Sequence, residues 1–154
     1  MSTDAPSAAL PADVVVAKRP ARPGPYRDPR AVTAVALGGV LGALLRAELE
    51  QLFPAGGGFP WTTLLINLVG TAVLGWVVVR VGERLPPSNY VRPLLGTGFC
   101  GGLTTFSTMQ VEAVQLIHHG NSVDAGAYLV LSLAGGLLAA AFVIRAARRA
   151  RWAS

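Results

Sequence analysis

Residues 101–109 place four hydroxyl side chains and a pair of glycines in the middle of an apolar stretch. The segment reads Gly-Gly-Leu-Thr-Thr-Phe-Ser-Thr-Met, and residues 93–111 around it carry no charged side chain. A helix that only had to lie in lipid would not gather hydroxyls and helix-loosening glycines at its centre. Irregular backbone at membrane depth is tolerated only where protein or a water-filled cavity surrounds it. We therefore expect the functional core here, with passage of an ion or small solute as the first hypothesis.

Side chains in and before this segment have chemistry suited to a small anion. Asn67 lies among apolar residues, and its amide offers two N–H donors and one acceptor, either to a neighbouring helix or to a solute. Phe106 and Met109 are three residues apart, a spacing typical of one helix face and of ordinary packing. Beside hydroxyl donors, however, the positive edge of an aromatic ring attracts an anion without a full charge. A full positive charge would bind the anion too tightly for fast release.

Acidic and hydroxyl residues further along extend this polar pattern. Glu112 follows Thr108 by four residues; an acid within a membrane segment is a functional candidate, unless it is hydrated near the interface. Tyr128 and Ser132 are also one helical turn apart, in the last apolar stretch. They either extend a polar face toward Ser107 and Thr108, or serve as an interfacial tyrosine and a serine bonded to its own backbone.

Arg46, near the end of the first apolar stretch, has two alternative roles. Its side chain either reaches lipid head groups or draws anions into an aqueous vestibule, where Glu48 and Glu50 partly neutralise it. No enzyme pattern accompanies these residues. The adjacent His118 and His119 lack the further ligands of a metal site, and the sequence has no serine-histidine-aspartate grouping or phosphate loop. We therefore predict that the protein is not an enzyme.

The composition indicates that lipid is the main solvent of this chain. Of the 154 residues, 52% are hydrophobic and 14% are charged, whereas soluble domains carry about 25% charged residues. Several apolar runs reach the length of roughly 20 residues that a helix needs to span a bilayer. We predict an all-α integral membrane fold with four transmembrane helices, over about 31–52, 60–81, 90–117 and 123–144, the third helix broken near its centre.

The remaining segments set the domain organisation. Residues 1–30, rich in proline and alanine, are predicted to form a disordered cytoplasmic tail, followed by a four-helix membrane domain over 31–145 and a basic cytoplasmic tail over 146–154. Small residues four apart, Gly38 with Gly42 and the stripe of Ser132, Gly136 and Ala140, predict close helix packing. The chain has no obvious internal repeat, so any inverted symmetry must come from a second subunit.

The basic residues predict how the protein is oriented in the membrane. All of the 13 lysines and arginines except Arg46 lie before the first predicted span, around the link between the second and third, or after the fourth. Cationic loops stay in the cytoplasm, so both termini are expected there, in a multi-pass protein of the cell membrane. The net charge of +5 also invites a nucleic-acid partner, which we reject because the charges mark the ends of apolar runs.

Three motifs resemble the CrcB/Fluc family of small fluoride channels. They are Gly-Gly-Val-Leu-Gly-Ala-Leu-Leu-Arg at 38–46, Trp-Thr-Thr-Leu-Leu-Ile-Asn-Leu-Val-Gly at 61–70, and Gly-Phe-Cys-Gly-Gly-Leu-Thr-Thr-Phe-Ser-Thr at 98–108. The resemblance extends from residue 31 to about residue 145. The third motif is the most specific, since it combines a glycine pair, two threonines, a phenylalanine and a serine in that order.

The resemblance implies a passive channel through which cytoplasmic fluoride leaves the cell, which protects against fluoride toxicity. It also implies an antiparallel dimer of four-helix subunits with two fluoride pathways. By position, the pathway residues would be Asn67, Phe106, Met109, Ser107, Thr108, Glu112, Tyr128 and Ser132, with Arg46 at the vestibule. A structural sodium ion (Na+) at the break in the third helix would be bound by the backbone carbonyls of Gly101 and Thr104.

Two features of the chain depart from this family pattern. The family usually has a second phenylalanine where this chain has Met109, which lacks a ring edge, so the pathway at this position is expected to be weaker or inactive. The one-sided charge forbids insertion in both orientations, so we predict a heterodimer with a homologous subunit of opposite orientation.

Two other functions are alternatives to a conducting subunit. The first is a non-conducting, supporting subunit of a heterodimeric fluoride channel, which the methionine at position 109 would explain. The second is a small multidrug antiporter, which would need a central titrating acid in the first span. Glu48 lies near the end of that span, beside Arg46, and fits this requirement poorly.

Overall fold

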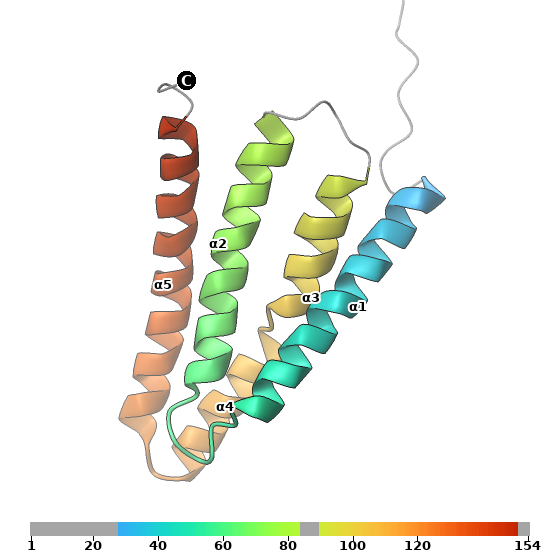
Figure 1. The fold of residues 1–154 in the computed structure, drawn as a ribbon. Coiled ribbons are helices and arrows are strands. Elements are labelled where there is room, and N and C mark those ends of the chain that lie inside the picture. The colour runs from blue at the N-terminus through green and yellow to red at the C-terminus, as the bar shows by residue number, and fades with distance from the viewer. Residues whose placement is uncertain (1–27, 84–89, 151–154) are drawn as a thin grey trace, which may run out of the picture.

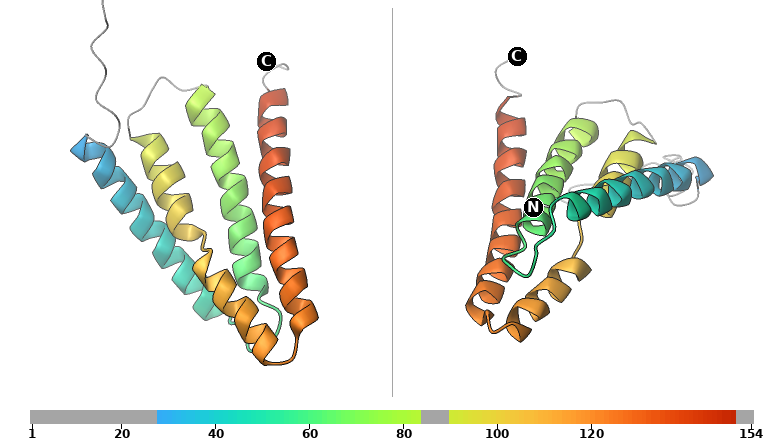
Figure 2. Two further views of the ribbon diagram at one scale, coloured as in Figure 1. Left: turned by 180° about the vertical axis from the view of Figure 1, so that it is seen from behind. Right: turned by 60° about the horizontal axis from the view of Figure 1, so that its bottom comes forward.

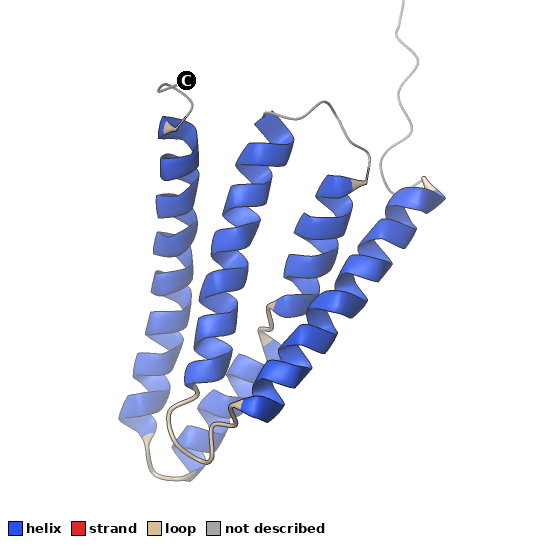
Figure 3. Ribbon diagram, in the orientation of Figure 1, coloured by secondary structure: helices blue, strands red, loops and turns tan. Residues whose placement is uncertain are grey.

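The protein is built of helices joined by short connections. The computed structural model describes residues 28–83 and 90–150, and no strand occurs in these ranges (Figure 1, Figure 3). The elements are α1 (Pro29–Leu52), α2 (Trp61–Glu83), η2 (Pro93–Cys100), α3 (Gly101–Leu103), α4 (Ser107–His118) and α5 (Ser122–Arg149). The predicted all-α class is confirmed.

The ends of the outer helices differ slightly from the predicted spans. The carboxylate of Asp28 accepts a hydrogen bond of 3.0 Å from the N–H of Arg30, and Pro29 occupies the first turn, so α1 begins before residue 31. α5 continues to Arg149, so residues assigned above to a basic tail extend the last helix. Of the predicted tails over 1–30 and 146–154, residues 1–27 and 151–154 lie outside the described residues, as does the link at 84–89.

The third predicted span is not a continuous helix. It begins as a π-helix, η2, passes into the short α3, and leaves helical geometry at Thr104, whose backbone is extended with φ −80° and ψ 150°. Helical structure resumes with α4 at Ser107. The break therefore falls at residues 104–106, in the hydroxyl-rich segment where the sequence predicts it. This segment therefore departs twice from a regular α-helix, at η2 and at the break. π-helical turns are rare and are frequently found at functional sites.

α1 packs along η2 and α3 through glycines on both sides. A Cβ atom at Gly38 or Gly42 would meet backbone atoms of η2, and a Cβ at Gly102 would meet the carbonyl of Gly39. Backbones can approach this closely only without side chains between them. The close packing predicted from Gly38 and Gly42 is confirmed.

α2 lies between the third segment and α5 (Figure 1). Gly135 of α5 packs against Leu68, and Gly75 of α2 lies against Ala140. A Cβ built on Gly136 has no neighbouring atom within 4 Å among the described residues. Gly135, and not the predicted Gly136, therefore provides the close approach at this point of the stripe.

One end of the bundle collects most of the described basic residues. The start of α1, the end of α2, the start of η2 and the end of α5 lie at the upper end of the ribbon in Figure 1 and in the left view of Figure 2. We call it the basic end. It carries Arg30, Arg80, Arg92, Arg145, Arg148 and Arg149.

Within residues 28–83 and 90–150, three helices, α1, α2 and α5, are long and apolar enough to cross a membrane. Their surfaces expose large apolar side chains, among them Leu37, Leu44, Leu137 and Phe142. Apolar surface of this extent is typical of contact with lipid or a partner chain. The third segment is interrupted and does not form such a helix by itself, so the count of four transmembrane helices stays a prediction.

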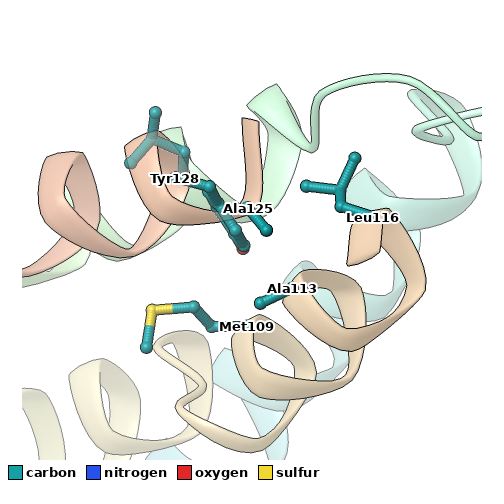
Figure 4. Packing of buried hydrophobic residues seen from close by; sticks show 6 residues of the cluster. Met109, Ala113, Leu116, Ala125 and Tyr128 are labelled. Carbon is teal, nitrogen blue, oxygen red and sulfur yellow. The ribbon is translucent and has the colours of Figure 1, made fainter. Parts of the chain in front are cut away.

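The buried core lies where α4 meets α2 and α5 (Figure 4). Phe59 adds its ring from the connection before α2, edge-on to the ring of Tyr128 at a centroid distance of 5.6 Å. This cluster fixes the chain after the break against the two long helices. Its members are Leu64, Met109, Ala113, Leu116, Ala125 and Tyr128.

Candidate functional site

Asn67 on α2 fastens the break in the third segment. Its side-chain N–H donates to the carbonyl of Thr105 at 3.0 Å, and its side-chain oxygen accepts from the N–H of Thr105 at 2.8 Å. The amide thus satisfies both backbone groups of a residue that has left the helix. The interhelical hydrogen bond considered for Asn67 is present, and among the described residues no second acceptor bonds its amide nitrogen, which carries another N–H.

The hydroxyl groups at the break and in the first turn of α4 bond to one another, and that of Thr105 also caps α4. The Thr105 hydroxyl accepts from the N–H of Thr108 at 3.2 Å and donates to the Thr108 hydroxyl at 3.1 Å. It also lies 3.3 Å from the hydroxyl of Ser107. A side-chain oxygen on an orphaned N–H is an N-terminal cap. Ser107 and Thr108 were predicted as site residues, whereas Thr105, whose hydroxyl bonds to both, was not.

Phe106 and Met109 lie in different surroundings. The side chain of Phe106, where the break meets α4, is 65% exposed. Met109 is 3% exposed and belongs to the core cluster with Tyr128 (Figure 4). The phenylalanine ring is therefore accessible to a second molecule, whereas the methionine fills the interior of its own chain.

Three helices meet at the carboxylate of Glu112 on α4. The Thr63 hydroxyl on α2 donates to one carboxylate oxygen at 2.7 Å, and the Tyr128 hydroxyl on α5 donates to the other at 2.6 Å. Both hydroxyl residues are fully buried. Short bonds to an ionised acceptor are among the stronger hydrogen bonds in proteins and make an acid tolerable at this depth. Thr63 was missed, although it precedes Asn67 by four residues on the same face of α2.

Ser132 on α5 supplies a buried hydroxyl that has no hydrogen-bond partner among the described residues. Its side chain is 8% exposed, and it follows the fully buried Tyr128 by one helical turn. Buried polar atoms are almost always bonded, so an unpaired one indicates a place for water, an ion or another small ligand.

Two hollows lie beside site residues, one at Glu112 and the other at Gly101 and Thr104. The first, of about 40 Å³, is roomy enough for water and lies between the 53–60 connection and α4, where it reaches Glu112, Gln115 and His119. The second, of about 340 Å³, lies between α2 and η2 and reaches Gly101 and Thr104. Glu112 therefore shares the first hollow with the 53–60 connection. This connection lies at the end of the bundle opposite the basic end (Figure 1).

Two backbone carbonyls at the break have lost their helical donors. In a continuous α-helix the carbonyl of Gly101 would accept from the N–H of Thr105, and that of Thr104 from the N–H of Thr108. The first N–H donates to Asn67 instead, and the second donates to the Thr105 hydroxyl. Carbonyl oxygens released from unwound helix are the type of ligand that a sodium ion takes within membranes.

Arg46 on α1 reaches the same break. Its Nε donates to the carbonyl of Gly102 at 3.3 Å, and its Nη1 lies 3.3 Å and 3.5 Å from the two carboxylate oxygens of Glu50. Of the two acids considered above, Glu50 is the one that pairs with Arg46, and Glu48 is exposed.

Comparison with known proteins identifies related chains. A family model described as CrcB-like protein, Camphor Resistance (CrcB), matches residues 33–144. The Mycobacterium bovis protein named fluoride-specific ion channel FluC 1 is 51% identical over 128 residues, which are 82% of this chain and 97% of that protein. Two Streptomyces avermitilis proteins are also similar. Fluoride-specific ion channel FluC 2 is 45% identical over 103 residues (66% of this chain, 65% of that protein), and FluC 3 is 44% identical over 109 residues (70% and 53%).

Proposed function

This chain belongs to the CrcB-like protein family, and from that premise we propose that it is a subunit of a passive, fluoride-selective channel in the cell membrane. Hydrogen fluoride crosses lipid when neutral and dissociates in a near-neutral cytoplasm, which traps the anion there. A channel lets fluoride leave down its gradient and so protects the cell, with no need for a nucleotide. The relatives are named as ion channels, and the prediction that this chain is not an enzyme is confirmed.

The observation that carries the proposal is the break fastened by Asn67. Asn67 of α2 bonds to Thr105, next to the residues that carry the hydroxyls of Ser107 and Thr108 and the exposed ring of Phe106. One amide N–H of Asn67 remains for an anion. An anion that loses its water there meets the weak dipoles of these N–H, hydroxyl and ring groups. Weak contacts in series let a strongly hydrated anion enter and still leave quickly.

We assign the continuation of the pathway to the buried polar groups of α4 and α5. The unpaired Ser132 hydroxyl supports a stop for the ion or its water, and Tyr128 leads from there to Glu112. The hollow beside Glu112 supports an exit at the end opposite the basic end. The proposed pathway comprises Asn67, Phe106, Met109, Ser107, Thr108, Glu112, Tyr128 and Ser132, to which the contacts of Glu112 add Thr63.

We also propose that the carbonyls of Gly101 and Thr104 bind a structural sodium ion. The residues fit the ion, because both carbonyl oxygens have lost their helical donors and neither group needs to be deprotonated. When bound, sodium would supply a fixed positive charge that holds the two oxygens together. Both residues border the hollow between α2 and η2, where a second subunit can bring further ligands.

An antiparallel dimer with a homologous subunit would complete this site. Phe106 is exposed at the break, so its ring is placed to serve a pathway shared with the partner. The arginines at the basic end support one fixed orientation, so the partner must insert the other way up. The numbered FluC 2 and FluC 3 of Streptomyces avermitilis indicate that one organism can hold several such chains, which supports a heterodimer.

Met109 favours a second candidate function, that of a supporting subunit. A methionine in the core beside Tyr128 offers no ring edge to an anion at this point. The chain would then complete the partner's pathway through Phe106, while its own pathway conducts weakly or not at all.

Substitution of one subunit at a time separates the two functions. Asn67→Asp replaces an N–H donor with a negative charge, so it should slow fluoride passage through this chain's pathway by about tenfold or more. The measurement is fluoride efflux from liposomes that hold the complete complex, with the matching asparagine of the partner substituted in a parallel sample. Loss of efflux on Asn67→Asp supports a conducting subunit, whereas full efflux contradicts it and supports the supporting role.

A further inference from the structure

We propose that Arg46 is a positioning residue, which with Glu50 forms a latch on the C-terminal end of α3. The latch would hold the carbonyls of Gly101 and Thr104 at the spacing that the sodium ion requires. This inference rests on the function proposed above and concerns a role for Arg46 other than attracting anions.

The latch acts on a backbone group that the break leaves without a partner. In a continuous helix the carbonyl of Gly102 would accept from the N–H of Phe106, but the extended backbone of Thr104 turns the chain away. The Nε of Arg46 donates to this carbonyl at 3.3 Å. A basic side chain on one of the last carbonyls of a helix satisfies an orphaned acceptor and complements the helix dipole.

The position of Arg46 follows from the glycine contact between α1 and the third segment. Gly38, Gly42 and Arg46 are spaced by four residues and share one face of α1. At Gly38 and Gly42 the backbones touch, and at Gly102 there is no room for a Cβ against Gly39. Arg46 continues this face by one turn. Since helical side chains point toward the N-terminus of their helix, its guanidinium reaches back to α3.

Glu50 fixes the other side of the guanidinium. Its two carboxylate oxygens lie 3.3 Å and 3.5 Å from Nη1 of Arg46, with side chains that are 25% exposed for Arg46 and 28% for Glu50. A paired arginine presents little net charge to a passing anion. Its planar guanidinium, however, holds its direction when two acceptors are bonded at once. The geometry therefore favours a role in positioning the backbone over a role in attracting anions.

The carbonyl that Arg46 holds is adjacent to a proposed sodium ligand. Gly102 follows Gly101 directly, and Thr104 is two residues further on. Among the described residues, two side chains from other helices bond to the backbone of 101–105. Asn67 bonds to Thr105, and Arg46 bonds to Gly102. Loss of the bonds from either side chain should allow the carbonyls of Gly101 and Thr104 to move apart.

The test is the dependence of thermal unfolding on sodium for the purified complex of full-length chains. Sodium chloride is titrated against N-methylglucamine chloride at constant ionic strength. The variants are Arg46→Gln, Arg46→Lys and Glu50→Gln, with Glu48→Gln as the matched control. Glu48 lies in the same turn of α1, is exposed, and loses the same charge on substitution.

We expect Glu50→Gln and both Arg46 variants to need about tenfold more sodium for the half-maximal rise in melting temperature. Lysine keeps the charge but cannot bond Gly102 and Glu50 with a planar fork, so Arg46→Lys should not restore the wild-type response to sodium. Glu48→Gln should match the wild type. If Arg46→Gln fails to fold, the sodium dependence of Glu50→Gln is compared with the wild type instead.

Attraction of anions by Arg46 predicts the opposite pattern. Glu50→Gln would then unmask the arginine and raise fluoride efflux, Arg46→Lys would behave as wild type, and the sodium response would be unchanged. Equal losses in Glu50→Gln and Glu48→Gln would also overturn the latch, because they would reflect lost charge alone. A wild-type complex without fluoride efflux rejects the channel. Efflux without a sodium response rejects the ion site and the latch with it.

Discussion

The hydroxyl of Tyr128 donates a 2.6 Å hydrogen bond to the carboxylate of Glu112, across the contact between α4 and α5. The other carboxylate oxygen is held by Thr63 of α2 at 2.7 Å. Two neutral hydroxyls thus stabilise an acid in the apolar part of the chain. Hydroxyls of the same kind are the groups that a dehydrated anion would contact, so under the proposed function the fluoride pathway and the stability of α4 would depend on the same side chains.

Tyr128→Phe removes one donor to Glu112 and keeps the ring in the core. Because a hydrogen bond to an ionised group contributes about 1.5–3 kcal/mol, we expect a loss of stability of that size. Thermal unfolding of the purified complex measures it, together with Thr63→Val and the double variant. The two substitutions should be coupled by at least about 0.5 kcal/mol, because they share one carboxylate. Additive losses would contradict a shared acceptor.

Gly42→Ala tests the glycine contact between α1 and the third segment. The new methyl group would meet the carbonyl of Phe99, so we expect a loss of about 1–3 kcal/mol and a lower melting temperature. Gly136→Ala is the matched control, because a Cβ at Gly136 meets no neighbouring atom among the described residues. It should be neutral or slightly stabilising, since alanine favours helix over glycine. Equal effects of the two substitutions would refute the assigned contact.

Met109→Phe restores an aromatic ring at the position where this chain departs from the pattern of the family it resembles. If the missing ring edge limits this chain's pathway, efflux of fluoride per complex should rise, by about twofold when two equal pathways conduct. Met109→Leu, which adds no ring, should leave efflux unchanged. Repacking of the core by Met109→Phe is expected to lower stability by about 1–3 kcal/mol at most. A folded Met109→Phe complex without faster efflux would argue that another feature keeps this pathway closed.

The orientation can be tested with single cysteines in a Cys100→Ser background. Ala150→Cys lies at the basic end, after α5, and Ala55→Cys lies in the connection at the opposite end. A maleimide that cannot cross membranes should label Ala55→Cys in intact cells, and Ala150→Cys only after permeabilisation. Labelling of both positions in intact cells would show insertion in two orientations and would remove the argument for a heterodimer.

The helices and the break were predictable because they depend on local sequence. Charge-free runs give the spans, and the hydroxyls and glycines of 101–108 mark where regular helix ends. The glycine pair at 38 and 42 predicted a close contact for a similar reason, since four-residue spacing places both on one face. The continuation of α5 to Arg149 was missed, because long arginine side chains can reach head groups while the backbone remains helical.

The pairings within the site were not predictable from the sequence. Nothing local indicates that both polar groups of Asn67 bond to Thr105, or that Thr63 reaches Glu112 across 49 positions of the chain. Whether Gly135 or Gly136 faces α2 depends on the rotation of α5 about its axis. A pattern of small residues does not determine this rotation to within one residue. The π-helix of η2 also has no signal in composition, because the tertiary contacts of α1 and α2 surround it.

The most direct test of the central claim is fluoride release from liposomes loaded with potassium fluoride and followed with a fluoride electrode. Purified complex with correctly paired subunits should release most of the fluoride when valinomycin balances the charge, and liposomes loaded with potassium chloride should retain their anion. Fluoride release no faster than from protein-free liposomes would contradict the account.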